Sequence, residues 1–125
     1  MPRRHDPVAL DRVAKTFSRL TLICHYGFYP HVDAMVTVAF RNENVYVSPD
    51  IYVFAPGGKL YVEAANGFMQ DQFLFGSSFP FRPVDQRVHD FQALGLSPDT
   101  LDAALWRNAN RVLGLDLARE GGQAS

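Results

Sequence analysis

Two residues whose side chains could do acid–base chemistry come after short β-prone runs. His25 directly follows the run 20–24, and Asp50 follows the run 45–47 after Ser-Pro. A histidine at a strand end can serve as a ligand, a general base or a hydrogen-bond partner of a substrate, and a nearby carboxylate can assist it. Structural roles are the alternatives: His25 as a hydrogen-bonded residue that closes a strand, and Asp50 as a turn residue bonded to its own backbone.

Further polar side chains follow a third apolar run, at 73–75. Ser77 and Ser78 come after a glycine but lack the Gly-x-Ser-x-Gly pattern of a hydrolase nucleophile. We therefore expect them to line a loop, with Ser78 in contact with a substrate. Arg82 is placed to pair with a substrate carboxylate through bidentate hydrogen bonds, and an exposed surface arginine is the alternative.

The loops after these three runs are also rich in aromatic residues. Such loops favour an apolar, aromatic-lined pocket or a contact surface for another chain. Tyr26, which directly follows His25, is the aromatic residue that we expect to bind substrate. The set comprises Tyr26, Phe28, Tyr29, Tyr52, Phe54, Phe79 and Phe81.

Helical segments must position these loops. Apolar residues at helical spacing predict helices that alternate with the three β-prone runs, and a further C-terminal helix. Alternation of this kind favours a parallel sheet with right-handed crossovers, in which the carboxyl ends of the strands share one rim. We therefore expect an α/β chain in which His25, Asp50 and Ser78 lie on the same rim. The expected helices cover about 7–18, 32–40, 60–68, 84–91 and 98–112.

Length and topology together predict association. We expect the 125 residues to form a single domain, 1–125, with a disordered tail at 120–125. Three parallel strands leave two open edges and one uncovered sheet face. The folded unit should therefore associate with another chain or form a piece of a larger fold.

Charge and composition restrict the partners. A formal net charge of −1 and a pI near 6.4 argue against nucleic acid or anionic membrane as a partner and favour a small molecule or a protein. No apolar run approaches the roughly 20 residues of a membrane span, and the start lacks the apolar core of a signal peptide, so we expect a cytoplasmic location. The single cysteine, Cys24, excludes an intramolecular disulfide and a cysteine-based zinc cage.

Five short segments follow one another along nearly the whole chain: His25-x-Gly27-x-x-Pro30, Asn44 to Ser48, Tyr61 to Asn66, Gln72 to Ser77 and Asn108 to Leu115. In this order they resemble the amidohydrolase-related family of metal-dependent hydrolases and decarboxylases. The resemblance implies a partial (β/α)8 TIM barrel, matching strands six to eight and lacking the first five. The chain has about half of the roughly 250 residues of a closed barrel.

This resemblance implies a site that the chain fills only in part. The family pattern has a His-x-His pair on strand one, a metal or catalytic group on strand five, a histidine on strand six and an aspartate on strand eight. His25 is the counterpart of the strand-six histidine, whereas Ser78 stands in place of the aspartate and no His-x-His occurs. A divalent ion needs three or more protein ligands. Zinc or manganese, which only the resemblance implies, should therefore bind weakly through His25, and only if another chain completes the site.

Two functions follow from these observations. In the first, the protein is a hydrolase or decarboxylase for a small carboxylated or aromatic substrate, and His25 works with Asp50. Its site would be completed by a homo-oligomer partner or by a companion chain that supplies the missing strands. In the second, the protein is a non-catalytic remnant or interaction module that retains only the packing motifs of the barrel. The sequence leaves enzymatic activity open between them.

Overall fold

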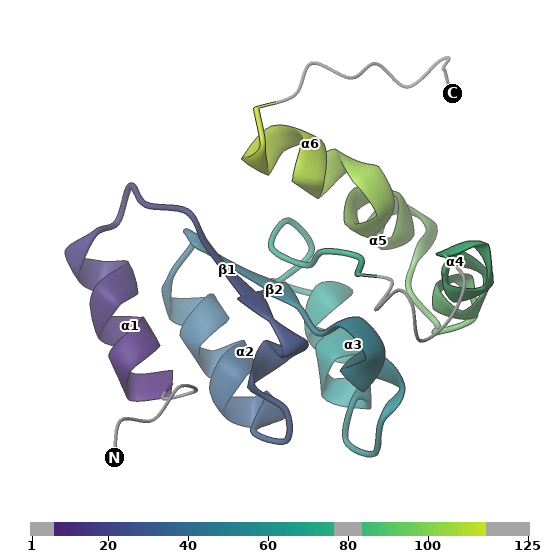
Figure 1. Cartoon of the computed structure of the whole chain (residues 1–125), viewed down its shortest axis with the longest axis horizontal. Helices are drawn as coiled ribbons and strands as arrows, with labels where there is room; N and C mark the ends of the chain where they lie inside the picture. The colour runs from purple at the N-terminus through teal and green to yellow at the C-terminus, as the bar shows by residue number, and fades with distance from the viewer. Residues whose placement is uncertain (1–6, 77–83, 115–125) are drawn as a thin grey trace.

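Helices alternate with parallel strands through the first half of the chain (Figure 1). The computed structural model describes residues 7–76 and 84–114. Amphipathic helices form where apolar residues recur at helical spacing, and both strands form at the β-prone runs. The elements in order are α1 (Pro7–Thr16), β1 (Leu22–His25), α2 (Val32–Arg41), β2 (Val45–Ser48) and α3 (Lys59–Ala65).

Strands β1 and β2 pair in parallel, with Leu22 opposite Val45 and His25 opposite Ser48. Side chains alternate between the two faces of this sheet. Val45 is fully buried against the helices, whereas Ile23, on the opposite face, is 40% exposed. In the part of the chain that the structure describes, one face of the sheet is therefore helix-covered and the other is largely open.

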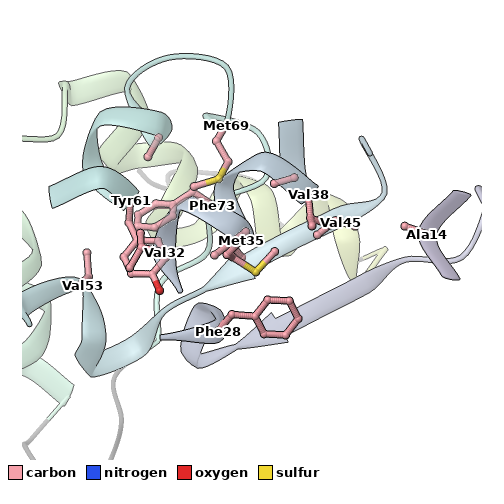
Figure 2. Packing of buried hydrophobic residues seen from close by; sticks show 14 of the residues in the cluster. Ala14, Phe28, Val32, Met35, Val38, Val45, Val53, Tyr61, Met69 and Phe73 are labelled. Atoms are coloured by element: carbon pink, nitrogen blue, oxygen red, sulfur yellow. The ribbon is translucent and has the colours of Figure 1, made fainter. Parts of the chain in front are cut away.

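The helix-covered face holds the hydrophobic core. Figure 2 shows Met35 from α2 and Tyr61 from α3 with Phe73 and Val45, all fully buried. Removing a side chain of this size from a packed core costs several kcal/mol, about 2–5. The core therefore fixes how the strands, and the loops at their carboxyl ends, sit relative to the helices.

The third predicted strand is present as an isolated parallel bridge between Val47 and Phe73. The amide of Val47 donates to the carbonyl of Gln72 at 2.7 Å. The ladder ends here because the next donor from β2 would be the residue after Ser48, which is Pro49 and has no amide N–H. The amide of Phe75 faces away from β2 and donates to the carbonyl of Ala104, 3.0 Å away in the C-terminal helical segment. The predicted α/β architecture with three parallel β segments is confirmed, but the third segment is shorter than its apolar sequence indicated.

The C-terminal part is helical (Figure 1). Ser97 begins its main segment as an N-cap, because its hydroxyl accepts a hydrogen bond from the amide of Thr100 at 3.2 Å. The predicted helix at 98–112 forms, but a π-helical turn interrupts it. The elements are α4 (Val84–Gln92), α5 (Pro98–Asp102), the π-helical turn Ala103–Arg107 and α6 (Asn108–Val112). None of the described helices has the length and apolar character that crossing a bilayer requires.

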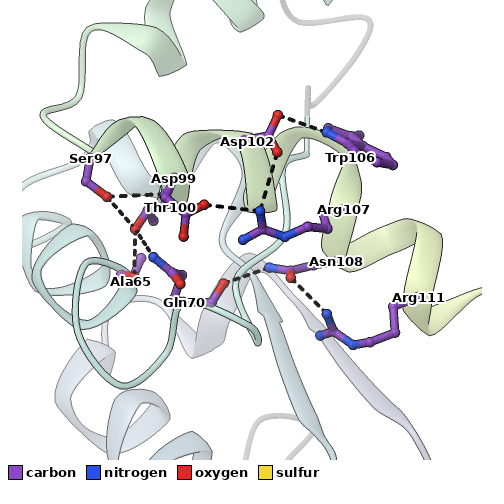
Figure 3. Close-up of polar contacts among 10 residues, drawn as sticks. All are labelled: Ala65, Gln70, Ser97, Asp99, Thr100, Asp102, Trp106, Arg107, Asn108 and Arg111. Carbon is purple, nitrogen blue, oxygen red and sulfur yellow. Dashed lines mark hydrogen bonds and ion pairs between the residues drawn. The ribbon is translucent and has the colours of Figure 1, made fainter. Parts of the chain in front are cut away.

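Side-chain amides join these elements. Asn44, Gln72 and Asn108 each donate to two or more backbone carbonyls. Asn108 is fully buried, and its Nδ2 donates at 2.8 Å to the carbonyls of Gln70 and Phe73. These bonds tie α6 to the third β segment. Figure 3 draws the bond from Asn108 to Gln70 within a larger polar network. Each of the three asparagine and glutamine side chains thus has a structural role.

Candidate functional site

His25 and Asp50 meet at the carboxyl ends of the two paired strands. His25 is the last residue of β1 and lies opposite Ser48, the last residue of β2. Asp50 follows two residues later, and its Oδ2 lies 3.7 Å from Nδ1 of His25. This distance is too long for a hydrogen bond but short enough for an ion pair when the imidazole is protonated.

The Asp50 carboxylate is held in place from two sides. Its Oδ1 accepts a hydrogen bond from the Ser48 hydroxyl at 2.8 Å. Gly76 lies so close that a Cβ there would overlap Oδ1 and would lie 2.9 Å from the Ser48 oxygen. The backbone of Asp50 itself has φ of +56°, a left-handed conformation that aspartate adopts more readily than most residues. With Oδ1 held in this way, the other carboxylate oxygen, Oδ2, is the one that lies near His25.

Exposure differs sharply between the two partners. The His25 side chain is 68% exposed and the Asp50 side chain 10% exposed. The imidazole is therefore open to a ligand or to solvent, while the carboxylate beside it is held largely inside the fold.

Four aromatic residues form a pocket beside His25, which we call the aromatic cup: Tyr26, Phe28, Tyr29 and Tyr52. It encloses about 160 Å³. Tyr29 and Tyr52 stack with ring centroids 4.6 Å apart, and Tyr26 meets Tyr52 edge-on at 5.8 Å. The ring of His25 lies 6.4 Å from that of Tyr26. Tyr26, the predicted substrate contact, therefore connects the imidazole to the cup.

An unusual turn builds one side of the cup. Tyr26, Gly27 and Phe28 all have positive φ, at 64°, 55° and 59°. Tyr61 of α3, fully buried, donates a hydrogen bond from its hydroxyl to the Gly27 carbonyl at 2.7 Å. A Cβ at Gly27 would lie 2.7 Å from that hydroxyl oxygen, so a larger residue does not fit. Burial raises the pKa of Tyr61 above its usual range, which keeps the hydroxyl protonated as a donor.

Sequence reasoning did not assign Ser48, Gly76 or Tyr61 to the site. All three stand in segments that carry the family resemblance, and this was the available signal. Their contacts join elements that are distant in the chain, so the partners were not readable from local patterns. Tyr61 in particular lies within the helix predicted at about 60–68, where apolar spacing gives no sign of a hydrogen bond to a distant loop.

Four of the predicted residues fall outside the described part of the chain. They are Ser78 and Arg82, predicted to bind substrate, and the aromatic residues Phe79 and Phe81. Cys24, in β1, is half-buried, and burial raises its pKa to about 11. Its thiol therefore stays protonated at neutral pH and is a poor nucleophile.

The donor set does not fit a complete metal site. Within residues 7–76 and 84–114, no three His, Cys, Asp or Glu side chains form a group that could hold a metal ion. His25 and Asp50 supply two donors, and a zinc or manganese site takes three or more from protein. The described part of the chain can therefore contribute two donors to a site, but not a complete metal site of its own.

Comparison with known proteins finds a family model and solved structures to which the chain is similar. A family model described as Amidohydrolase matches residues 3–115. Among solved structures, the chain is similar to the uncharacterized TIM-barrel protein Bb4693 of Bordetella bronchiseptica, with 37% sequence identity and a TM-score of 0.83. The match covers 88% of this chain and 40% of that chain, so this chain spans about two fifths of its neighbour's length. No curated protein matches.

Proposed function

The chain belongs to the amidohydrolase family, and we propose that it acts as a hydrolase or decarboxylase on a small carboxylated or aromatic substrate. The observation that carries this proposal is the His25–Asp50 pair at the carboxyl ends of adjacent parallel strands. In TIM barrels this end of the strands carries the active site. The aromatic cup beside His25 offers an aromatic surface for the substrate.

His25 is the general base or acid of this reaction. Its exposed imidazole takes a proton from water or substrate and returns it to the leaving group or product carbon. The charge of Asp50, 3.7 Å away, stabilises the imidazolium that forms. Such proton transfer contributes about 10²- to 10⁴-fold in rate. In this proposal Ser78 and Arg82 contact the substrate, with the guanidinium binding a carboxylate.

Another polypeptide completes the site in this proposal, either a companion chain or a second copy. Two observations support it: the exposed Ile23 on the open sheet face, and the match to about two fifths of a TIM-barrel neighbour. An apolar side chain left in water forgoes roughly 1.5–3 kcal/mol of stabilisation. Zinc or manganese, if the reaction uses one, would take its remaining ligands from that polypeptide, because His25 and Asp50 alone are too few.

A complementation assay tests the proposal. The chain is co-expressed with the part of the Bordetella protein that the match leaves uncovered. The assembly is then supplied with zinc or manganese and assayed for product release from a panel of small aromatic and aliphatic carboxylates and esters. Turnover that needs both polypeptides and falls about a hundredfold or more in His25→Ala supports the proposal. Turnover unaffected by His25→Ala contradicts it.

A non-catalytic interaction module is the second candidate. It is favoured by the two-donor site and by the structural use of Asn44, Gln72 and Asn108 within the segments that resemble the family. Stable assembly without turnover of any compound in the panel would support this candidate over the enzyme.

A further inference from the structure

We infer that the π-helical turn Ala103–Arg107 is a positioning element of the candidate site. Through the Ala104 carbonyl it holds Phe75, and through Phe75 it sets the next residue, Gly76, against the Asp50 carboxylate. The inference deepens the proposed function and rests on it, because this carboxylate belongs to the pair that would carry the reaction. The C-terminal helical segment thereby takes part in the site through its backbone.

The π-helical turn leaves the Ala104 carbonyl open to a donor outside the helix. The amide of Asn108 donates to the carbonyl of Ala103, five residues back. In a regular α-helix it would donate four residues back, to Ala104. Ala104 is almost fully buried, so its carbonyl needs a partner within the protein. Single π-helical turns are rare and occur frequently at functional sites.

The partner of this carbonyl is the amide of Phe75, 3.0 Å away in the third β segment. The preceding amide, of Leu74, donates at 2.9 Å to the Val47 carbonyl in β2. Successive amides of an extended segment point to opposite sides. The third β segment is therefore held by β2 on one side and by the C-terminal helical segment on the other, through two consecutive residues.

Further contacts with the C-terminal part fix the same stretch. Nδ2 of Asn108 donates to the Phe73 carbonyl at 2.8 Å. Phe91 of α4 is buried, and its ring centroid lies 5.8 Å from that of Phe73 and 5.1 Å from that of Phe75. The position at which the chain leaves the third β segment is thus set largely by the helices that follow it.

Gly76, the next residue, packs tightly against Asp50. A Cβ on Gly76 would overlap Oδ1 of Asp50, and the same oxygen accepts a hydrogen bond from Ser48 at 2.8 Å. A displacement of Gly76 towards Asp50 would therefore push the carboxylate, and a displacement away would leave it less confined. Misplacement of a reacting group by about 1 Å can cost about a hundredfold in rate. The bond at Phe75 thus influences where the carboxylate lies relative to His25.

Side chains of the helical segment stabilise the turn itself. Asp102, the residue before the turn, accepts hydrogen bonds from Nε1 of Trp106 at 2.9 Å and from Nη1 of Arg107 at 3.5 Å (Figure 3). These partners lie four and five residues further on, so the two bonds span the widened turn. The turn is therefore held by its own side chains as well as by Phe75.

Deletion of Leu105 tests the role of the turn on the full chain. With one residue fewer, the amide of Asn108 lies four residues after Ala103, so the segment can continue as a regular α-helix. The Ala104 carbonyl then receives a donor from its own helix. Leu105→Ala is the matched control, because it removes the same half-buried side chain without shortening the turn.

Hydrogen exchange of the Phe75 amide is the readout of this comparison. We expect it to exchange at least tenfold faster in the deletion variant than in Leu105→Ala. The core amide of Met35, which is bonded within the start of α2, serves as the reference for global unfolding. Equal exchange of Phe75 in the two variants, relative to Met35, would remove the role of the turn.

Replacement of Phe75 by phenyllactic acid removes the same hydrogen bond without changing the helix. The resulting ester keeps the aromatic ring but has no N–H. The same replacement at Phe17 is the control, because its amide donates to the Val13 carbonyl at 2.9 Å, in and just after α1. This pair of variants decides the question if the deletion variant does not fold.

Gly76→Ala separates positioning from general stabilisation. If the Phe75 bond sets Gly76 against Asp50, its removal lets an alanine at position 76 move away from the carboxylate. Gly76→Ala should then lower the melting temperature by no more than half as much in the Phe75 ester as in the parent chain. In the Phe17 ester the loss should equal that in the parent. Equal losses in all three backgrounds would show that the positions are independent and would overturn the inference.

The positioning role and the proposed function fail separately. In the complemented assembly the Phe75 ester should lower kcat about tenfold and leave KM within about twofold, because the aromatic cup is unchanged. Coupling between Phe75 and Gly76 in an assembly that shows no turnover would leave the positioning role standing and contradict the reaction. Turnover that depends on His25 but is the same in the Phe75 ester and the parent would do the reverse.

Discussion

Oδ2 of the Asp50 carboxylate lies 3.7 Å from Nδ1 of the His25 imidazole, where two adjacent parallel strands end. The acid is nearly buried and the base is mostly exposed. Asp50 is fixed in position by Ser48 and Gly76, and the imidazole of His25 is the member of the pair that a ligand can reach.

Asp50→Asn removes the negative charge beside His25 while keeping the shape of the side chain. Asparagine tolerates the left-handed backbone of Asp50 and can still accept from Ser48, but it carries no charge. In the complemented assembly we expect turnover to fall about 10- to 100-fold, while the free energy of unfolding changes by less than about 1 kcal/mol. Turnover and urea denaturation measure the two effects.

Asp50→Ala is the contrasting variant. It places a residue without a polar side chain at positive φ and removes the acceptor of the Ser48 hydroxyl, at a cost of about 1–3 kcal/mol. If Asp50→Asn retained full turnover and only Asp50→Ala lost it, the carboxylate would be structural.

Gly76→Ala should displace the Asp50 carboxylate. A Cβ at this position overlaps Oδ1 of Asp50, so the backbone or the carboxylate must move. Overpacking of this kind costs about 1–3 kcal/mol in stability. Gly67→Ala is the control, because its Cβ would make only an ordinary contact, 3.6 Å from the Glu63 carbonyl oxygen. Equal unfolding midpoints for the two variants would contradict the close packing of Gly76 on Asp50.

Asn108→Ala should loosen the C-terminal helix from the third β segment. The change leaves the carbonyls of Gln70 and Phe73 without their buried donor, at a cost of about 2 kcal/mol. Arg111→Ala removes two bonds of an exposed side chain, one to the Asp71 carbonyl and one to Oδ1 of Asn108, and should cost less than Asn108→Ala because water can replace its guanidinium. Chemical denaturation of both variants checks the order, and a larger loss for Arg111→Ala would refute the structural role assigned to Asn108.

Cys24 should react slowly with thiol reagents. Burial raises its pKa to about 11 by disfavouring the charged thiolate, so at pH 8 the thiolate is about a hundredfold scarcer than for a free thiol. The rate of iodoacetamide labelling should rise about tenfold per pH unit up to pH 10. Labelling in urea, where the thiol is exposed, supplies the reference rate. A folded chain that reacted as fast as the unfolded one at pH 8 would contradict this burial.

Local periodicity was enough to predict most of the fold. The apolar spacing at 7–18 and 32–40 corresponds to α1 and α2 within two residues at each end, and both strands form where β-prone runs were found. The contact of the third β segment with the C-terminal helical segment was not predictable, because the hydrogen bond from Phe75 to Ala104 joins residues that are distant in the chain. The π-helical turn within the last helix had no sequence signal that we recognised.

The proximity of His25 and Asp50 was predictable, because both lie at or just beyond the ends of parallel strands. Parallel strands bring their carboxyl ends together, which is why His25 and Asp50 are neighbours. The packing of Gly76 against Asp50 was not predictable. Gly76 belongs to another β segment, and it matters because it has no Cβ, which leaves room for the Asp50 carboxylate. The same holds for Tyr61, whose hydroxyl reaches a carbonyl on a loop far away in sequence.

The most direct test of the proposed reaction compares His25→Ala with His89→Ala in the complemented assembly. His89 is an exposed histidine on α4, so its removal controls for the loss of a surface imidazole. We predict that His25→Ala lowers kcat about a hundredfold or more while the assembly and its melting temperature stay as in the parent, and that His89→Ala changes neither. Equal kcat values for the two variants would contradict a reacting role for His25.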